Sequence, residues 1–179
     1  MTGFLHSLPW DEIGIQMIGF IAMALDCFSF QAKKRKWILL IQIAACVFWI
    51  LQMLLLGGYT GAAMNLLAIG RAVVFMLKDK YQWAQSKWTL FITISAFIGA
   101  AMMTYENLLS LLPMGAMIVL TVALYLSDER KIRVIALLSV PLWFVYDFNI
   151  GSYAGIASEI MNFSSILIAM ARYRKNNKP

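Results

Sequence analysis

Long apolar segments separated by short hydrophilic breaks make up almost the whole chain. The segments lie near residues 13–32, 37–56, 59–77, 88–104, 107–126, 134–149 and 153–171. Each approaches the roughly 20 apolar residues that an α-helix needs to cross the hydrocarbon core of a bilayer. The pattern therefore predicts an all-α polytopic membrane protein of seven transmembrane helices, with the lipid bilayer as its principal partner.

The hydrophilic breaks alternate between basic and non-basic segments. Basic side chains occupy every second break, at Lys33, Lys34, Arg35, Lys36, Lys78, Lys80, Lys87, Arg130, Lys131, Arg133, Arg172, Arg174, Lys175 and Lys178. The positive-inside rule assigns these breaks to the cytoplasm. We therefore expect the N-terminus outside and the C-terminus in the cytoplasm, with Arg71 as the one basic residue inside a span.

Composition agrees with a membrane protein and argues against other classes. Of the 179 residues, 61% are hydrophobic and 13% are charged, and the mean hydropathy is +0.74. This leaves too little polar surface to cover a soluble globule, so we expect a single membrane domain over residues 1–179. The net charge of +6 is spread over four short segments rather than one face, which argues against a nucleic-acid partner.

The chain contains an internal repeat at an offset of 94 residues. The offset superimposes pairs of uncommon residues: Trp49 on Trp143, Gly57 on Gly151, Tyr59 on Tyr153, Gly61 on Gly155 and Met76 on Met170. The predicted units are residues 13–77 and 107–171, and residues 88–104 form a connector helix between them. Because one extra crossing separates two units of three helices, the units are expected to be parallel.

This three-plus-one-plus-three plan is similar to that of the SWEET sugar facilitators and the PnuC vitamin transporters, which hold substrate between two three-helix bundles. Three groups of residues carry a second resemblance: Gly57–Ala62 followed by Arg71, Leu111–Pro113 with Gly115, and Trp143 followed by Gly151, Ser152, Gly155 and Glu159. On these residues the chain resembles the YgjV family of small bacterial inner-membrane proteins. The resemblance covers most of the chain, implies a multi-pass protein of the bacterial cytoplasmic (inner) membrane, and names no substrate.

Two charged residues of the first unit are expected at the same depth. Asp26 and Arg71 each lie about 18–20 Å from the outer edge, if an α-helix rises about 1.5 Å per residue. Three interpretations remain open. The two residues form a buried ion pair that locks the first bundle, they form a gate, or Arg71 extends along its stem to the cytoplasmic headgroups.

A set of polar and aromatic residues is expected in the outer half of the membrane, between the two bundles. It comprises Asn65, Glu159, Asn162, Gln52, Tyr146, Trp49 and Trp143. Polar groups beside aromatic faces suit a small polar or cationic molecule, so these are the candidate substrate-binding residues. The alternative is that the asparagines join helices and the tryptophans fill the interior. Asp147, near the outer end of its span, is expected to be half solvated.

Three residues are candidate hinges: Gly19, Pro113 and Pro141. Gly19 and Pro113 coincide at the 94-residue offset. The two prolines are expected to interrupt their spans, because proline removes a backbone hydrogen bond and kinks a helix. Such kinks either permit alternating access or only shape the packing.

No catalytic or cofactor-binding pattern occurs. The sequence holds one histidine, His6, and neither a glycine-rich phosphate loop nor a spacing typical of metal ligands. We therefore expect no enzyme, no cofactor and no metal. The expected function is a facilitator or transporter of a small polar or cationic molecule, by alternating access between the two bundles, with a second copy of the chain as a candidate partner. The alternative is a non-transporting accessory, sensory or structural protein of the inner membrane.

Overall fold

The computed structural model describes residues 9–29, 35–77, 80–125, 134–135 and 137–176. Over these residues the chain forms α-helices and two short 3-10 helices, and no strand. The elements are α1 (Pro9–Ser29), α2 (Arg35–Leu55), α3 (Tyr59–Leu77), η1 (Gln82–Gln85), α4 (Lys87–Met103), η2 (Leu108–Leu111), α5 (Leu112–Tyr125), α7 (Ser139–Ile150) and α8 (Tyr153–Asn176). The all-α prediction is confirmed, and each predicted apolar segment contains a described helix.

The outer surface of the bundle is apolar. Large side chains such as Phe91, Ile92 and Phe148 point away from the interior, which is typical of helices that face lipid. By length and composition alone, one described helix is long and apolar enough to cross a membrane, over Asp11–Ser29. Three further apolar helices are shorter, at Leu40–Leu55, Lys87–Met103 and Leu108–Ala123.

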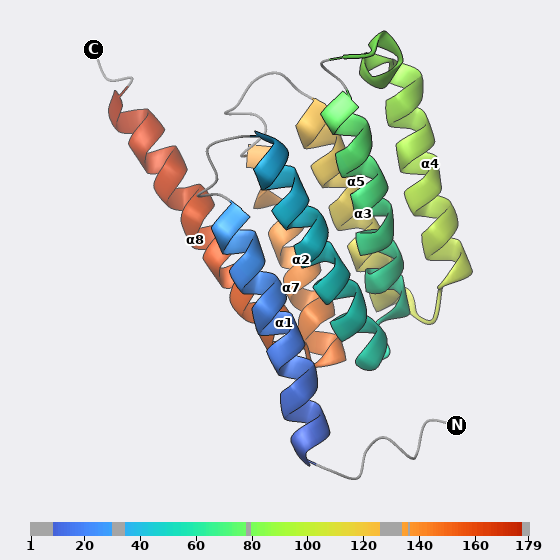
Figure 1. The fold of residues 1–179 in the computed structure, drawn as a ribbon, viewed down its shortest axis with the longest axis vertical. Helices are drawn as coiled ribbons and strands as arrows, with labels where there is room; N and C mark the ends of the chain where they lie inside the picture. Colours follow the sequence, from blue (N-terminus) through green and yellow to red (C-terminus); the bar gives the residue numbers. More distant parts are fainter. Residues whose placement is uncertain (1–8, 30–34, 78–79, 126–133, 136, 177–179) are drawn as a thin grey trace.

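The helices form an up-and-down bundle with α8 and α4 at opposite edges (Figure 1). Helix α1 packs against α2 and α8, whereas α3 packs against α2, α4 and α5. Helix α7 packs against α5 and α8. The turns that join α2 to α3 and α7 to α8 lie at the end of the bundle where α1 begins, and α8 finishes at the opposite end.

The α2–α3 turn and the α7–α8 turn have the same backbone geometry. Gly57 and Gly151 adopt left-handed φ values of 78° and 73°, which glycine reaches without a steric penalty. The next N–H closes each helix: that of Gly58 donates to the carbonyl of Met53 at 2.7 Å, and that of Ser152 to the carbonyl of Asp147 at 2.9 Å. Every member of the first turn corresponds to a member of the second at the 94-residue offset.

The two prolines mark helix starts rather than kinks within long helices. Pro113 is the second residue of α5, where its missing N–H leaves no intrahelical bond unmade. The predicted segment 107–126 is therefore divided into η2 and α5. Pro141 is the third residue of α7, and a turn at Leu138 interrupts the predicted segment 134–149 just before it.

Gly19 lies in the middle of α1 and allows α2 to approach closely. The side chain of Gln52 occupies the space that a Cβ atom at position 19 would need. The structure therefore gives Gly19 a packing role between two neighbouring helices. Its role as a hinge stays a prediction.

Candidate functional site

The seven predicted substrate-binding residues separate into two groups. One group lies at the α2–α3 turn and the start of α3 and contains Asn65, Trp143 and Tyr146. The other lies along the first half of α8 and contains Gln52, Trp49, Glu159 and Asn162. The separation arises because α3 packs against α5 whereas α8 packs against α1. The structure therefore does not gather the seven residues into one constellation between α3 and α8. Each group instead combines side chains from both predicted units.

Tyr146 of α7 reaches across to the first turn of α3. Its phenol oxygen accepts a hydrogen bond from the backbone N–H of Gly61 at 3.0 Å. Gly61 permits this approach, since a Cβ atom there would lie 2.7 Å from the Tyr146 ring and from the sulfur of Met53. Trp143 supports Tyr146 edge to face, with ring centroids 6.0 Å apart. Tyr146 therefore satisfies an N–H group that the first turn of a helix leaves without an intrahelical partner.

Asn65 lies one turn further along α3 and belongs to the same packed group. Its side-chain amide donates to the carbonyl of Gly61 at 3.0 Å and lies 3.4 Å from the sulfur of Met53. Both Asn65 and Met53 are buried. These contacts favour a structural role for Asn65, as a hydrogen bond within its own helix.

Gln52 of α2 makes the reciprocal contact with the α7–α8 turn. Its side-chain carbonyl accepts a hydrogen bond from the hydroxyl of Ser152 at 3.2 Å, and that hydroxyl accepts from the N–H of Gly155 at 3.1 Å. Gln52 and Tyr146 are equivalent at the 94-residue offset. The second helix of each predicted unit therefore holds the turn of the other unit.

Gln16 of α1 completes the contact at this turn. Its side-chain amide donates to the carbonyl of Gly151 at 2.7 Å. Its oxygen accepts from the amide of Gln52 at 3.2 Å and from the N–H of Tyr153 at 3.0 Å. These bonds join the first half of α1 to the start of α8.

Asp147 is the residue whose importance the sequence interpretation missed. Its side chain is only 3% exposed, and its Oδ1 atom has no hydrogen-bond partner within the described part of the chain. The prediction of a half-solvated side chain was therefore wrong. Gly155 makes this burial possible, because a Cβ atom there would lie 2.5 Å from the carboxyl carbon of Asp147. Asp147 thus packs on Gly155 as Met53 packs on Gly61.

Two further acids follow Asp147 in the bundle: Glu159 lies nearer to it, and Asp26 lies beyond Glu159. Glu159 of α8 is half-buried, and its Oε1 atom accepts from the amide of Asn162 at 3.4 Å. Glu159 is close enough to interact electrostatically with Asp147 and with Asp26 of α1. Within the described ranges, no three His, Cys, Asp or Glu side chains lie close enough to hold a metal ion. The acids are therefore neighbours in a series rather than one chelating cluster.

Asp26 and Arg71 have separate partners. The Oδ2 atom of Asp26 accepts from the indole N–H of Trp49 at 2.8 Å. The guanidinium of Arg71 donates to the hydroxyl of Thr121 at 3.0 Å and lies 5.7 Å from the ring centroid of Phe97. The predicted Asp26–Arg71 ion pair is therefore not formed, and Arg71 instead joins α3 to α4 and α5.

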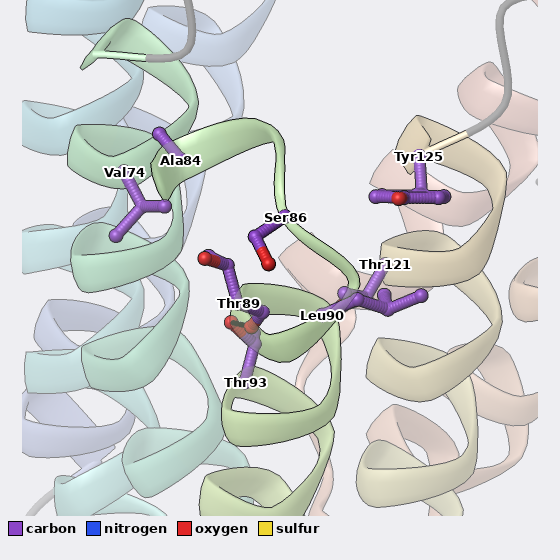
Figure 2. A pocket seen from close by; sticks show the side chains of 8 residues that line it. All are labelled: Val74, Ala84, Ser86, Thr89, Leu90, Thr93, Thr121 and Tyr125. Atoms are coloured by element: carbon purple, nitrogen blue, oxygen red, sulfur yellow. Dashed lines mark hydrogen bonds between the residues drawn. The ribbon is translucent and has the colours of Figure 1, made fainter. Parts of the chain in front are cut away.

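A small pocket lies away from both groups, where the end of α3 and η1 meet the start of α4 and the end of α5 (Figure 2). It is lined by Val74, Ala84, Ser86, Thr89, Leu90, Thr93, Thr121 and Tyr125. Its interior holds roughly one water molecule. None of the predicted substrate-binding residues lines this pocket.

Comparison with known proteins bears on the location of the chain. The family model Imp-YgjV, described as a bacterial inner membrane protein, matches residues 13–177. This range includes both turns and all three acids, and it confirms the resemblance read from the sequence. No curated protein and no solved structure matches the chain.

Proposed function

Because the chain belongs to the Imp-YgjV family of bacterial inner membrane proteins, we propose that it is a seven-span transporter of a small polar or cationic molecule. In this proposal the N-terminus is outside and the C-terminus is in the cytoplasm. Helices α1, α2 and α3 form one unit, α5, α7 and α8 form a parallel second unit, and α4 connects them. The two units rock against each other to give alternating access.

Reciprocal contacts support the two parallel units. Two copies related by an axis along the helices should exchange equivalent interactions, and Tyr146 and Gln52 do so, each at the turn of the opposite unit. Helix packing is exchanged in the same way, since α1 packs against α8 and its counterpart α5 packs against α3. A parallel repeat explains both observations with one symmetry.

One observation carries the proposed site: the carboxyl group of Asp147 is buried near Glu159, and its Oδ1 atom has no partner among the described residues. An ionised carboxyl group in hydrocarbon costs several kcal/mol unless a cation or a proton accompanies it. A small cationic molecule beside these acids would supply that charge. Asn162 adds a polar amide one helical turn beyond Glu159. We therefore assign the cation-binding role to Asp147 and Glu159.

A non-transporting scaffold or accessory subunit is the second candidate, and the packed interior favours it. Gln52 is fully buried, and Trp143 and Tyr146 pack ring against ring. In this alternative the reciprocal contacts hold the two units in one fixed arrangement. The acids then serve assembly only.

Accessibility of position 162 separates the two functions. The test uses Asn162→Cys in a chain carrying Cys27→Ala and Cys46→Ala, with a membrane-impermeant maleimide added to either side of the vesicles. Alternating access exposes this position to each side in turn, so we expect labelling from both sides. Phe163→Cys is the matched control, because the neighbouring Phe163 side chain is exposed on the apolar outer surface and faces lipid in this proposal. Its thiol is expected to stay unlabelled.

Labelling of the Asn162→Cys protein from neither side contradicts transport and supports the scaffold. Labelling from one side only contradicts alternating access. Labelling from both sides, with the control unlabelled, supports the transporter.

A further inference from the structure

Three acids form a series along one side of the bundle, from α7 through α8 to α1. The Gln16–Tyr153 hydrogen bond sets a common level for α1 and α8 near the turn. Asp147 packs against a glycine two residues past this level, so it lies about 3 Å below it. Glu159 lies about 9 Å below the level along α8, and Asp26 about 15 Å below it along α1. Measured along the helix axes, Asp147 and Glu159 are therefore about 6 Å apart, and Glu159 and Asp26 are about 6 Å apart as well.

The first acid of the series is buried, and one of its two carboxyl oxygens has no hydrogen-bond partner within the described residues. Asp147 is 3% exposed, its Oδ1 atom has no partner within the described ranges, and its carboxyl group packs on Gly155, one helical turn before Glu159 on α8. Asn162 is the hydrogen-bond partner of Glu159 on α8. Within the described ranges, therefore, neither of the first two acids has a basic side chain as a hydrogen-bond partner.

The third acid, Asp26, has a partner on α2 in addition to its electrostatic interaction with Glu159 of α8. Trp49 donates to Asp26, and Cys46 lies near enough to interact electrostatically with both Asp26 and Arg71. Arg71 itself is held by Thr121 on α5. The guanidinium of Arg71 is thus engaged with α5, and Asp26 keeps Trp49 as its hydrogen-bond partner.

We propose that Asp147, Glu159 and Asp26 form a proton relay that lets this transporter carry protons across the membrane. The inference rests on the proposed transport function. In each step the O–H bond of one carboxylic acid breaks as an O–H bond forms on the next, ionised carboxylate. One proton enters at Asp147, within a turn of the end of α7, and leaves from Asp26, within a turn of the end of α1. Nothing is oxidised or reduced.

The spacing favours a proton over a metal cation. Hard cations need several oxygen ligands at one point, at distances of about 2.0–2.6 Å. Acids about 6 Å apart along the helices do not converge in this way. A proton needs only one oxygen at a time, so the acids that carry it do not have to converge on one point.

Proton flux into proteoliposomes tests the relay. The vesicles contain the pH-sensitive dye pyranine, and a potassium gradient with valinomycin drives protons inward. We expect the wild-type protein to carry protons faster than protein-free vesicles. Asp147→Asn, Glu159→Gln and Asp26→Asn should each reduce the flux to the protein-free rate, because each removes one proton-binding site. Glu106→Gln is the control, since Glu106 is exposed after α4 and outside the series, and its flux should equal that of the wild type.

A second pair of variants keeps all three acids. Gly155→Ala forces the Asp147 carboxyl group to move, because the new Cβ atom would lie 2.5 Å from its carbon. We expect a several-fold loss of proton flux. Gly14→Ala, a glycine in α1 with nothing within 4 Å of the added Cβ atom, should leave the flux unchanged.

The relay is overturned if any of the three neutral variants carries protons as fast as the wild type. It is also overturned if the wild type carries protons no faster than protein-free vesicles. If the wild type carries no protons while the Asn162→Cys protein is labelled from both sides, the relay fails and transport stands. If both measurements are negative, transport and relay fail together.

Discussion

The α2–α3 turn and the α7–α8 turn have the same backbone and satisfy it with different side chains. Each helix ends at a left-handed glycine, and each following N–H bonds back in the same way. In the second turn Ser152 accepts a hydrogen bond from the N–H of Gly155 within its own helix. In the first turn Gly58 has no side chain, and Tyr146 from the other unit accepts from Gly61 instead. The geometry therefore requires the glycines and leaves the capping group free to change.

The residues behind the two turns differ more strongly. Met53 and Asn65 fill the space behind the first turn with a thioether and an amide that contact each other. Asp147 and Glu159 occupy the equivalent positions behind the second turn, and both are acids. The comparison teaches that one backbone can support a packed structural contact on one side and a candidate ion site on the other.

Exchanging the central residues of the two turns should give the largest effect. Met53→Asp buries a carboxyl group beside Asn65 with no cation, so we expect the free energy of unfolding to fall by about 3–5 kcal/mol. Asp147→Met removes a buried carboxyl group whose Oδ1 atom has no partner in the described part of the chain, so it should raise the apparent melting temperature while abolishing transport. Thermal unfolding of the purified proteins in detergent measures the stability of both variants, and proton flux into proteoliposomes measures the loss of transport. Equal losses of stability would mean that the two turns do not differ as described.

Exchanging the capping groups should give an intermediate effect. Tyr146→Gln withdraws the acceptor from the Gly61 N–H and should cost about 1–3 kcal/mol. Gly58→Ser alone should also destabilise, because a Cβ atom there would lie 2.9 Å from the Tyr146 hydroxyl. Together they should recreate the Ser152 arrangement, so the double variant should lose about 1 kcal/mol less than the two losses added. A double-mutant cycle on unfolding measures this coupling. Strictly additive losses would contradict the equivalence of the two caps.

Substituting the left-handed glycines should give the smallest effect, and an equal one. Gly57→Ala and Gly151→Ala each place a Cβ atom in a conformation that costs about 1–2 kcal/mol, with open space around it. We expect the two melting temperatures to fall by the same amount. Proton flux should be retained in both, because neither added Cβ atom meets a side chain within 4 Å and so neither displaces a carboxyl group of the series. A difference between the melting temperatures of the two glycine variants would show that the backbones of the two turns are not equivalent.

The sequence by itself determined the properties that depend on one helix at a time. Apolar length predicted where the helices lie, and glycine predicted the two turns, because both are local requirements of the backbone. The motifs shared with the YgjV family identified the inner-membrane family correctly. The 94-residue repeat stays a prediction, supported by the matched turns.

Only the tertiary structure decided which helices are neighbours. Helical rise placed Asp26 and Arg71 at one depth, yet Asp26 contacts Trp49 and Arg71 contacts Thr121. Depth misled in the same way for Asp147, which lies near a helix end but is covered by α8 at Gly155. Helices that are apolar on nearly every face have no single apolar face that selects one neighbouring helix. The sequence pattern therefore predicts the position of a residue along the bundle axis but not which helix its side chain contacts.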